Sequence, residues 1–156
     1  MALGIYISVP FCKTKCSYCN FASGVFSKQV FKRYVDRVVE DIGKAEATAA
    51  QIRGRFEREV DSIYLGGGTP TLLEPAQLQR VFEAVRSHFK VSPAAEITVE
   101  CAPGTLSPNV IETLRGHRFF VTRSRRFLNC RVCMAKWAGS PTSQPNGRTI
   151  AAGPLR

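Results

Sequence analysis

The chain has 156 residues, of which 44% are hydrophobic, and these values suit one globular domain rather than a disordered or fibrous protein. No run approaches the roughly eighteen apolar residues of a membrane span, and the start has neither a basic region nor a cleavage signature, so we expect a cytoplasmic protein. The net charge of +10 is uneven: residues 1–116 carry 14 Lys/Arg and 12 Asp/Glu, whereas residues 117–156 carry 8 Lys/Arg and no acid. A nucleic-acid partner is therefore not expected for the front of the chain.

The first part of the chain predicts a strand, a loop and a long helix. Apolar and polar residues alternate over residues 3–9, with Tyr6 and Ser8 on the face opposite the apolar residues. A cysteine-rich loop follows, and apolar residues then recur at helical spacing over residues 30–42.

The alternation of strand and helix then continues. A second strand is predicted over residues 61–65, and Pro75 suits the first turn of a helix whose apolar stripe reaches Phe89. A third strand is predicted over residues 96–101. Ser107-Pro108 then suits the N-cap and first turn of a third helix.

This order predicts an α/β fold in which crossovers join parallel strands, as in an α/β barrel or a doubly wound sheet. Functional residues should then lie at the carboxyl ends of the strands. Three features fall there: the cysteine loop after the first strand, the run Gly66-Gly67-Gly68 after the second, and Glu100 at the end of the third.

In a reducing compartment, cysteines are better explained as metal ligands, catalytic groups or buried residues than as disulfides. Cys12, Cys16 and Cys19 have the spacing C-x3-C-x2-C, so their thiolates could converge on a 4Fe-4S cluster and leave its fourth iron open. A structural zinc site would need a fourth ligand, and the histidines, His88 and His117, are distant in the sequence. Incidental or buried cysteines are the plainer alternative.

The spacing C-x3-C-x-aromatic-C, with Tyr18 as the aromatic residue, resembles the signature of radical-SAM enzymes. The resemblance implies that S-adenosylmethionine (SAM) chelates the open iron, and that an electron from the reduced cluster cleaves it to a 5'-deoxyadenosyl radical that abstracts hydrogen. The protein would position the cofactors and exclude water and oxygen. An electron donor such as a flavodoxin or ferredoxin is also implied.

The same resemblance implies which residues bind SAM. Gly67, Gly68 and Thr69 match the family's run that pairs with the methionyl amino group, while Tyr6, Tyr18 and Glu100 match other SAM-binding positions. The run has neither the lysine of a P-loop nor the spacing of a dinucleotide fingerprint. An ordinary turn, a solvated glutamate and barrel packing are the respective alternatives for the glycine run, Glu100 and Tyr6.

Longer segments narrow the resemblance. They are Ile5-Tyr6-Ile7-Ser8-Val9-Pro10-Phe11-Cys12, Tyr64-Leu65-Gly66-Gly67-Gly68-Thr69-Pro70-Thr71 and Glu100-Cys101-Ala102-Pro103-Gly104-Thr105. Together they resemble the oxygen-independent coproporphyrinogen III oxidase family, including its haem-chaperone branch, over residues 3–116. The dehydrogenases usually have a cysteine where Phe21 stands, which favours the chaperone branch and implies haem or porphyrin as a partner. The family commonly has His at Ser8 and Asn at Ala102.

The implied fold is a partial (β/α) barrel of radical-SAM type with about three β/α units over residues 1–116, followed by an irregular tail. Residues 117–156 lack acids and clear periodicity after Val121, so our hypothesis is a truncation or a change of reading frame near Gly116. A basic nucleic-acid arm is the functional alternative, with aromatic side chains among the arginines: Phe119, Phe120, Phe127 and Trp137.

The remaining cysteines have weaker interpretations. Cys130 and Cys133 form a C-x2-C pair that could bind zinc or a second cluster, but a chance pair is favoured because no other Cys or His lies beside them. Cys101 is interpreted as a packing residue. Three functions therefore stay open: a radical-SAM enzyme, a haem chaperone, and a basic interaction protein with a structural metal site.

Overall fold

The computed structural model describes residues 2–15, 17, 19–102, 104–117 and 120–123 of the chain. Its elements follow in the order β1 (Leu3–Val9), α1 (Lys28–Gly43), α2 (Ala45–Gln51), β2 (Glu59–Gly67), the 3-10 turn η1 (Pro70–Leu72), α3 (Pro75–His88), β3 (Lys90–Cys101), α4 (Pro108–Gly116) and β4 (Phe120–Arg123). The four strands form one parallel sheet in the order β1-β2-β3-β4. The expected α/β fold with parallel strands is confirmed.

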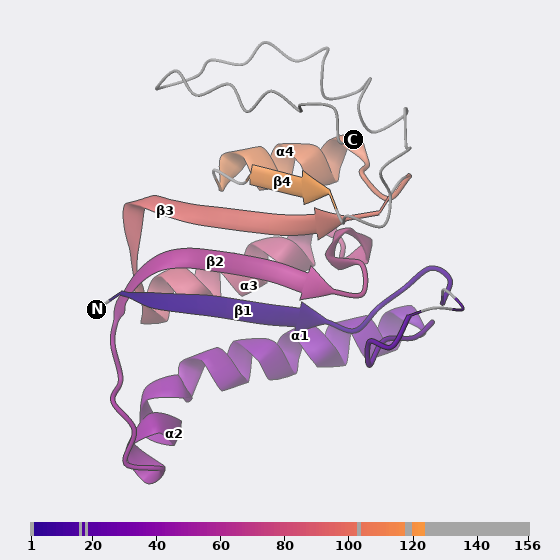
Figure 1. The fold of residues 1–156 in the computed structure, drawn as a ribbon. Helices are drawn as coiled ribbons and strands as arrows, with labels where there is room; N and C mark the ends of the chain where they lie inside the picture. Colours follow the sequence, from indigo (N-terminus) through magenta and orange to yellow (C-terminus); the bar gives the residue numbers. More distant parts are fainter. Residues whose placement is uncertain (1, 16, 18, 103, 118–119, 124–156) are drawn as a thin grey trace, which may run out of the picture.

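The helices cover one face of this sheet, and the core lies between the two layers (Figure 1). The strands send alternate apolar side chains into this core, and α1, α3 and α4 contribute the facing stripe. Fully buried members of the cluster include Val9, Val35, Leu65, Leu78, Val85, Val99 and Leu114. Burial of these side chains away from water is the main force that holds the layers together. No helix within the described ranges is long and apolar enough to cross a membrane.

The other face of the sheet carries the polar and aromatic side chains of the strands. Tyr6 of β1 pairs in register with Tyr64 of β2, which pairs with Thr98 of β3. One step further along the strands, Ser8 pairs with Gly66. We call this surface the open face, and its carboxyl edge is the edge to which all strand arrows point in Figure 1.

Besides the short turn η1, two elements were not predicted from the sequence. Helix α2 buries none of its residues, so it has no apolar stripe that a pattern could reveal. Strand β4 has only four residues, which are too few for a clear periodic pattern, and it extends the sheet past residue 116. Residues 124–156, with Phe127, Cys130, Cys133 and Trp137, lie outside the described residues, as does Phe119, so the hypotheses about the tail stay predictions.

Candidate functional site

The cysteine loop begins at the carboxyl end of β1 and is closed at its base by backbone pairing. Phe11 forms a parallel bridge with Gly24; Cys12 N–H donates to Gly24 O at 2.8 Å, and Gly24 N–H donates to Pro10 O at 2.9 Å. Cys12 and Cys19 are partly exposed on this loop. Cys16 and Tyr18 lie outside the described residues, so the structure describes two of the three predicted cluster ligands.

An aromatic cluster anchors the start of the loop to α1. Phe11 is 1% exposed and stacks on Phe31, with 3.9 Å between ring centroids, while Phe26 and Tyr34 meet its ring edge-on. The Tyr34 hydroxyl donates to Ser8 O at 2.8 Å. Burial, with a smaller effect of Tyr6, raises the pKa of Tyr34 to about 12, so this donor stays protonated at neutral pH.

The glycine run is bonded directly to the backbone that precedes Cys12. Gly68 N–H donates to Val9 O at 2.7 Å, and Thr69 N–H donates to Phe11 O at 2.6 Å. A Cβ atom on Gly68 would lie 2.5 Å from Phe11 O and 2.9 Å from Val9 O. Glycine is required here because another backbone segment occupies the place of a side chain.

Glu100 lies at the carboxyl end of β3 with both carboxylate oxygens engaged. Its Oε1 accepts from the Tyr64 hydroxyl at 2.8 Å, and its Oε2 accepts from Gly67 N–H at 3.1 Å. A Cβ atom on Gly66 would lie 2.5 Å from the Tyr64 ring and 3.2 Å from Glu100 Oε2, so the absence of a side chain makes room for this arrangement. The carboxylate is therefore held as a fixed acceptor at the edge of the open face.

Tyr6 forms an exposed aromatic pair with Tyr64 on the open face. Their ring centroids are 5.7 Å apart with an interplanar angle of 20°, and Tyr6 is 56% exposed. A flat, accessible ring of this kind can pack against a planar or apolar ligand group. The alternation over residues 61–65 places Tyr64 on this face, but our sequence analysis gave it no role.

The predicted SAM-binding residues that the structure describes lie along one edge of the sheet. Gly67, Gly68, Thr69 and Glu100 share a hydrogen-bonded network with the end of β1, and Tyr6 lies in the neighbouring row. Within the described part of the chain, no three Cys, His, Asp or Glu side chains form a group that could hold a metal ion. Cys16, the middle member of the predicted triad, lies outside that part of the chain.

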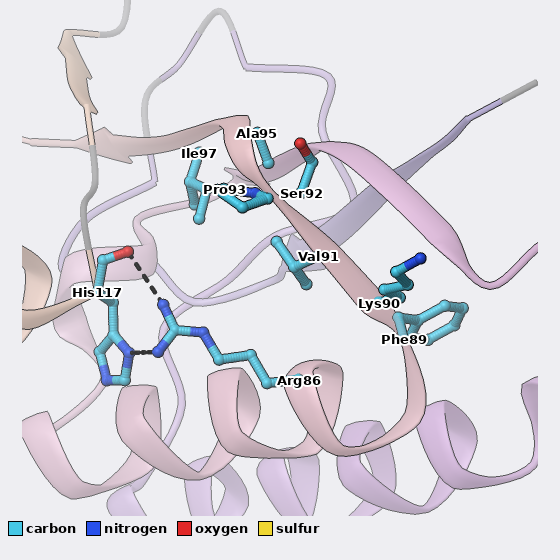
Figure 2. A pocket seen from close by; sticks show the side chains of 9 residues that line it. All are labelled: Arg86, Phe89, Lys90, Val91, Ser92, Pro93, Ala95, Ile97 and His117. Atoms are coloured by element: carbon cyan, nitrogen blue, oxygen red, sulfur yellow. Dashed lines mark hydrogen bonds between the residues drawn. The ribbon is translucent and has the colours of Figure 1, made fainter.

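A surface hollow of about 420 Å³ lies elsewhere, between α3 and the first half of β3 (Figure 2). Arg86 spans one side of it, donating to His117 O at 3.2 Å and contacting His117 Nδ1 at 2.9 Å. Burial and the Arg86 charge lower the pKa of His117. The hollow is lined by none of the predicted site residues.

Comparisons with known proteins agree on one family. The sequence model of the Radical SAM superfamily matches residues 6–123. The heme chaperone HemW of Escherichia coli (strain K12) is 37% identical over 105 residues, which are 67% of this chain and 26% of that protein. The oxygen-independent coproporphyrinogen III oxidase of Bradyrhizobium diazoefficiens is 34% identical over 112 residues, or 71% and 24% of the two chains.

A solved structure gives the same result for the fold. Coproporphyrinogen III oxidase (HemN) from Escherichia coli, described as a radical SAM enzyme, superposes with a TM-score of 0.66 at 30% identity. The match covers 78% of this chain and 27% of that one. The chain therefore spans about a quarter of the length of the relatives it matches.

Proposed function

Because the chain belongs to the radical SAM superfamily, we propose that Cys12, Cys16 and Cys19 hold a 4Fe-4S cluster and that SAM binds beside it at the carboxyl edge of the sheet. The observation that carries this proposal is the hydrogen-bonded network around the glycine run. It joins Glu100, through Gly67, to the backbone immediately before Cys12. Groups from three separate strands are thereby held at the place where a cluster and its ligand would have to meet.

The described residues fit an iron–sulfur cluster. Thiolates are the ligands that such clusters take, and Cys12 and Cys19 are partly exposed on a loop with a fixed base. Ser23, close to that base, has a buried hydroxyl without a hydrogen-bond partner among the described residues. A cluster would give this hydroxyl an acceptor.

The network also limits how each residue can bind SAM. The amide N–H groups of Gly67, Gly68 and Thr69 donate within the protein, so this run offers carbonyl oxygens rather than amides to the SAM ammonium group. Glu100 accepts hydrogen bonds from hydroxyl or amino groups of SAM. The Tyr6 ring packs against SAM, and the Tyr18 ring would do the same from the cysteine loop. When bound together, the cluster and SAM supply one-electron chemistry that removes a hydrogen atom from a substrate.

We further propose a role in haem or porphyrin metabolism, closer to the haem chaperones than to the coproporphyrinogen dehydrogenases. Phe21, 46% exposed beside the cysteine loop, favours the chaperones because the dehydrogenases usually have cysteine there. An acidic electron donor such as a flavodoxin or ferredoxin would suit residues 1–35, which carry five Lys/Arg and no acid.

Anaerobic reconstitution with iron and sulfide, followed by EPR of the reduced protein, tests the proposal. We expect a 4Fe-4S signal that SAM perturbs and that Cys16→Ala lacks. The matched control is Cys130→Ala/Cys133→Ala, which removes two thiols outside the proposed triad and should keep the signal. A cluster EPR signal that SAM does not perturb, or that requires Cys130 and Cys133 instead of Cys16, would contradict the proposal.

A second measurement separates the two branches. A chaperone should bind haem stoichiometrically without turnover, which absorbance titration would detect. A coproporphyrinogen dehydrogenase should release 5'-deoxyadenosine when substrate and reductant are supplied. Salt-dependent nucleic-acid binding that survives Cys12→Ala would instead favour the basic interaction protein.

A further inference from the structure

Ser23 is a buried polar residue whose side chain no contact among the described residues explains. It is 8% exposed, and its Oγ has no hydrogen-bond partner within the described ranges. A buried hydroxyl that has lost water without gaining a partner is unfavourable, so such groups usually have a ligand or a functional role. Its own backbone N–H is satisfied by Phe21 O at 2.7 Å, which leaves the side chain as the unexplained group.

The backbone around Ser23 places it on the same side of the ribbon as the first predicted cluster ligand, Cys12. Gly24 pairs with Phe11 in a parallel bridge, and residues paired in this way project to the same side of the ribbon. The contacts agree, because a Cβ atom on Gly24 would lie 3.1 Å from the Phe26 ring, and that ring packs on Phe11. Because the bridge is parallel, Ser23 lies opposite Pro10 and diagonally across from Cys12. Neighbouring residues alternate in direction, so Ser23 and Cys12 both project to the side of the ribbon away from Phe11.

We propose that the Ser23 hydroxyl donates a hydrogen bond to a sulfur of the cluster held by Cys12, Cys16 and Cys19, and thereby raises the reduction potential of that cluster. The inference rests on the proposed function, since it requires the cluster to be present. A donor aimed at a cluster sulfur stabilises the reduced form, which carries one more negative charge. Ser23 would thus tune the cluster without binding iron or touching the reacting atoms.

The test is a redox titration of the reconstituted full chain, monitored by EPR. Ser23→Ala should shift the midpoint potential to a more negative value, and Ser23→Thr, which keeps a hydroxyl, should stay near the wild-type value. Ser27→Ala is the matched control, because Ser27 is exposed in the same loop and its side chain makes no capping hydrogen bond. It should leave the potential unchanged.

Two further measurements distinguish an effect of Ser23 on the cluster's reduction potential from a purely structural role of Ser23. In deuterated buffer, an exchangeable deuteron coupled to the reduced cluster should be present in the wild type and absent in Ser23→Ala. The cluster-free Ser23→Ala protein should unfold at the same temperature as the wild type or higher, because the variant removes an unsatisfied buried donor. A lower unfolding temperature would mean that the hydroxyl has a partner in the protein, and would overturn the inference.

The outcomes also distinguish this inference from the proposed function. If the wild type and Ser23→Ala both take up a SAM-responsive cluster with the same potential, the proposed function stands and the role of Ser23 is wrong. If the wild type takes up no cluster at all, both fail together. If Ser23→Thr shifts the potential as far as Ser23→Ala does, altered packing rather than a lost donor is the cause, and the inference is again overturned.

Discussion

Glu100 and Gly67 are 33 residues apart in the sequence, and the carboxylate Oε2 of Glu100 accepts a hydrogen bond from the Gly67 N–H at 3.1 Å. This bond joins the carboxyl ends of β3 and β2. Because the next amide along the run, that of Gly68, donates to Val9 O, the link continues to the end of β1. One acidic side chain therefore takes part in fixing three strand ends relative to one another.

We expect Glu100→Gln to weaken SAM binding by about tenfold, because the neutral amide is a poorer acceptor than a carboxylate. The EPR signal of the cluster without SAM should be unchanged, since Glu100 is not a proposed ligand. SAM titration of the reconstituted protein measures this effect. Glu96→Gln is the control, because Glu96 lies on the same face of β3, away from the glycine run. Equal losses in the two variants would contradict a specific role of Glu100.

Gly68→Ala should destabilise the fold by at least about 2 kcal/mol, because its Cβ atom would lie 2.5 Å from Phe11 O, a backbone atom that cannot move alone. The displaced backbone precedes Cys12, so cluster incorporation should fall as well. Urea unfolding and iron content measure the two effects. Gly116→Ala is the control: a Cβ atom there meets nothing within 4 Å, and alanine favours the helix. Equal free energies of unfolding for the two variants would contradict the steric argument.

Most of the fold could be predicted because its signals are local. The alternation in residues 3–9 gives β1 with its correct bounds, and Pro75 begins α3 as predicted. The first half of β3 was missed, because it depends on partners across the sheet: Lys90 pairs in register with Glu59 and forms an ion pair with it at 2.9 Å. Neither residue carries a strand pattern of its own.

The candidate site could be proposed from the sequence only where it consists of motifs. Motif resemblance proposed Glu100 and the glycine run as site residues, but it gave no sign of the Tyr64 hydroxyl, 36 residues earlier in the chain, which donates to Glu100. Burial of Ser23 had no signal either, since a serine in a polar loop is usually exposed. The Tyr64–Glu100 contact and the burial of Ser23 depend on how separate segments of the chain pack together, and a local sequence pattern does not contain that information.

Ser107→Ala should lower the free energy of unfolding by about 1 kcal/mol, because the Ser107 hydroxyl caps α4 by accepting from Val110 N–H at 3.3 Å. This N-cap was predicted from the sequence and is confirmed. Ser27→Ala removes the N-cap residue of α1, whose side chain makes no capping bond, and should cost clearly less. Urea unfolding of both variants decides the matter, and a larger loss for Ser27→Ala would be the opposite of what we expect.

Tyr34→Phe should change how stability depends on pH. Burial raises the pKa of Tyr34 to about 12 in the folded chain, against about 10 when unfolded, so folding favours the protonated phenol. Its contribution is complete below pH 10 and is lost as the pH rises from 10 to 12. At pH 7 the variant should be less stable by about 1 kcal/mol, because Ser8 O loses its donor, and the wild-type advantage should shrink towards pH 12. Urea unfolding of both proteins from pH 7 to 12 measures this difference, and parallel curves would show that the Tyr34 hydroxyl does not titrate as its burial requires.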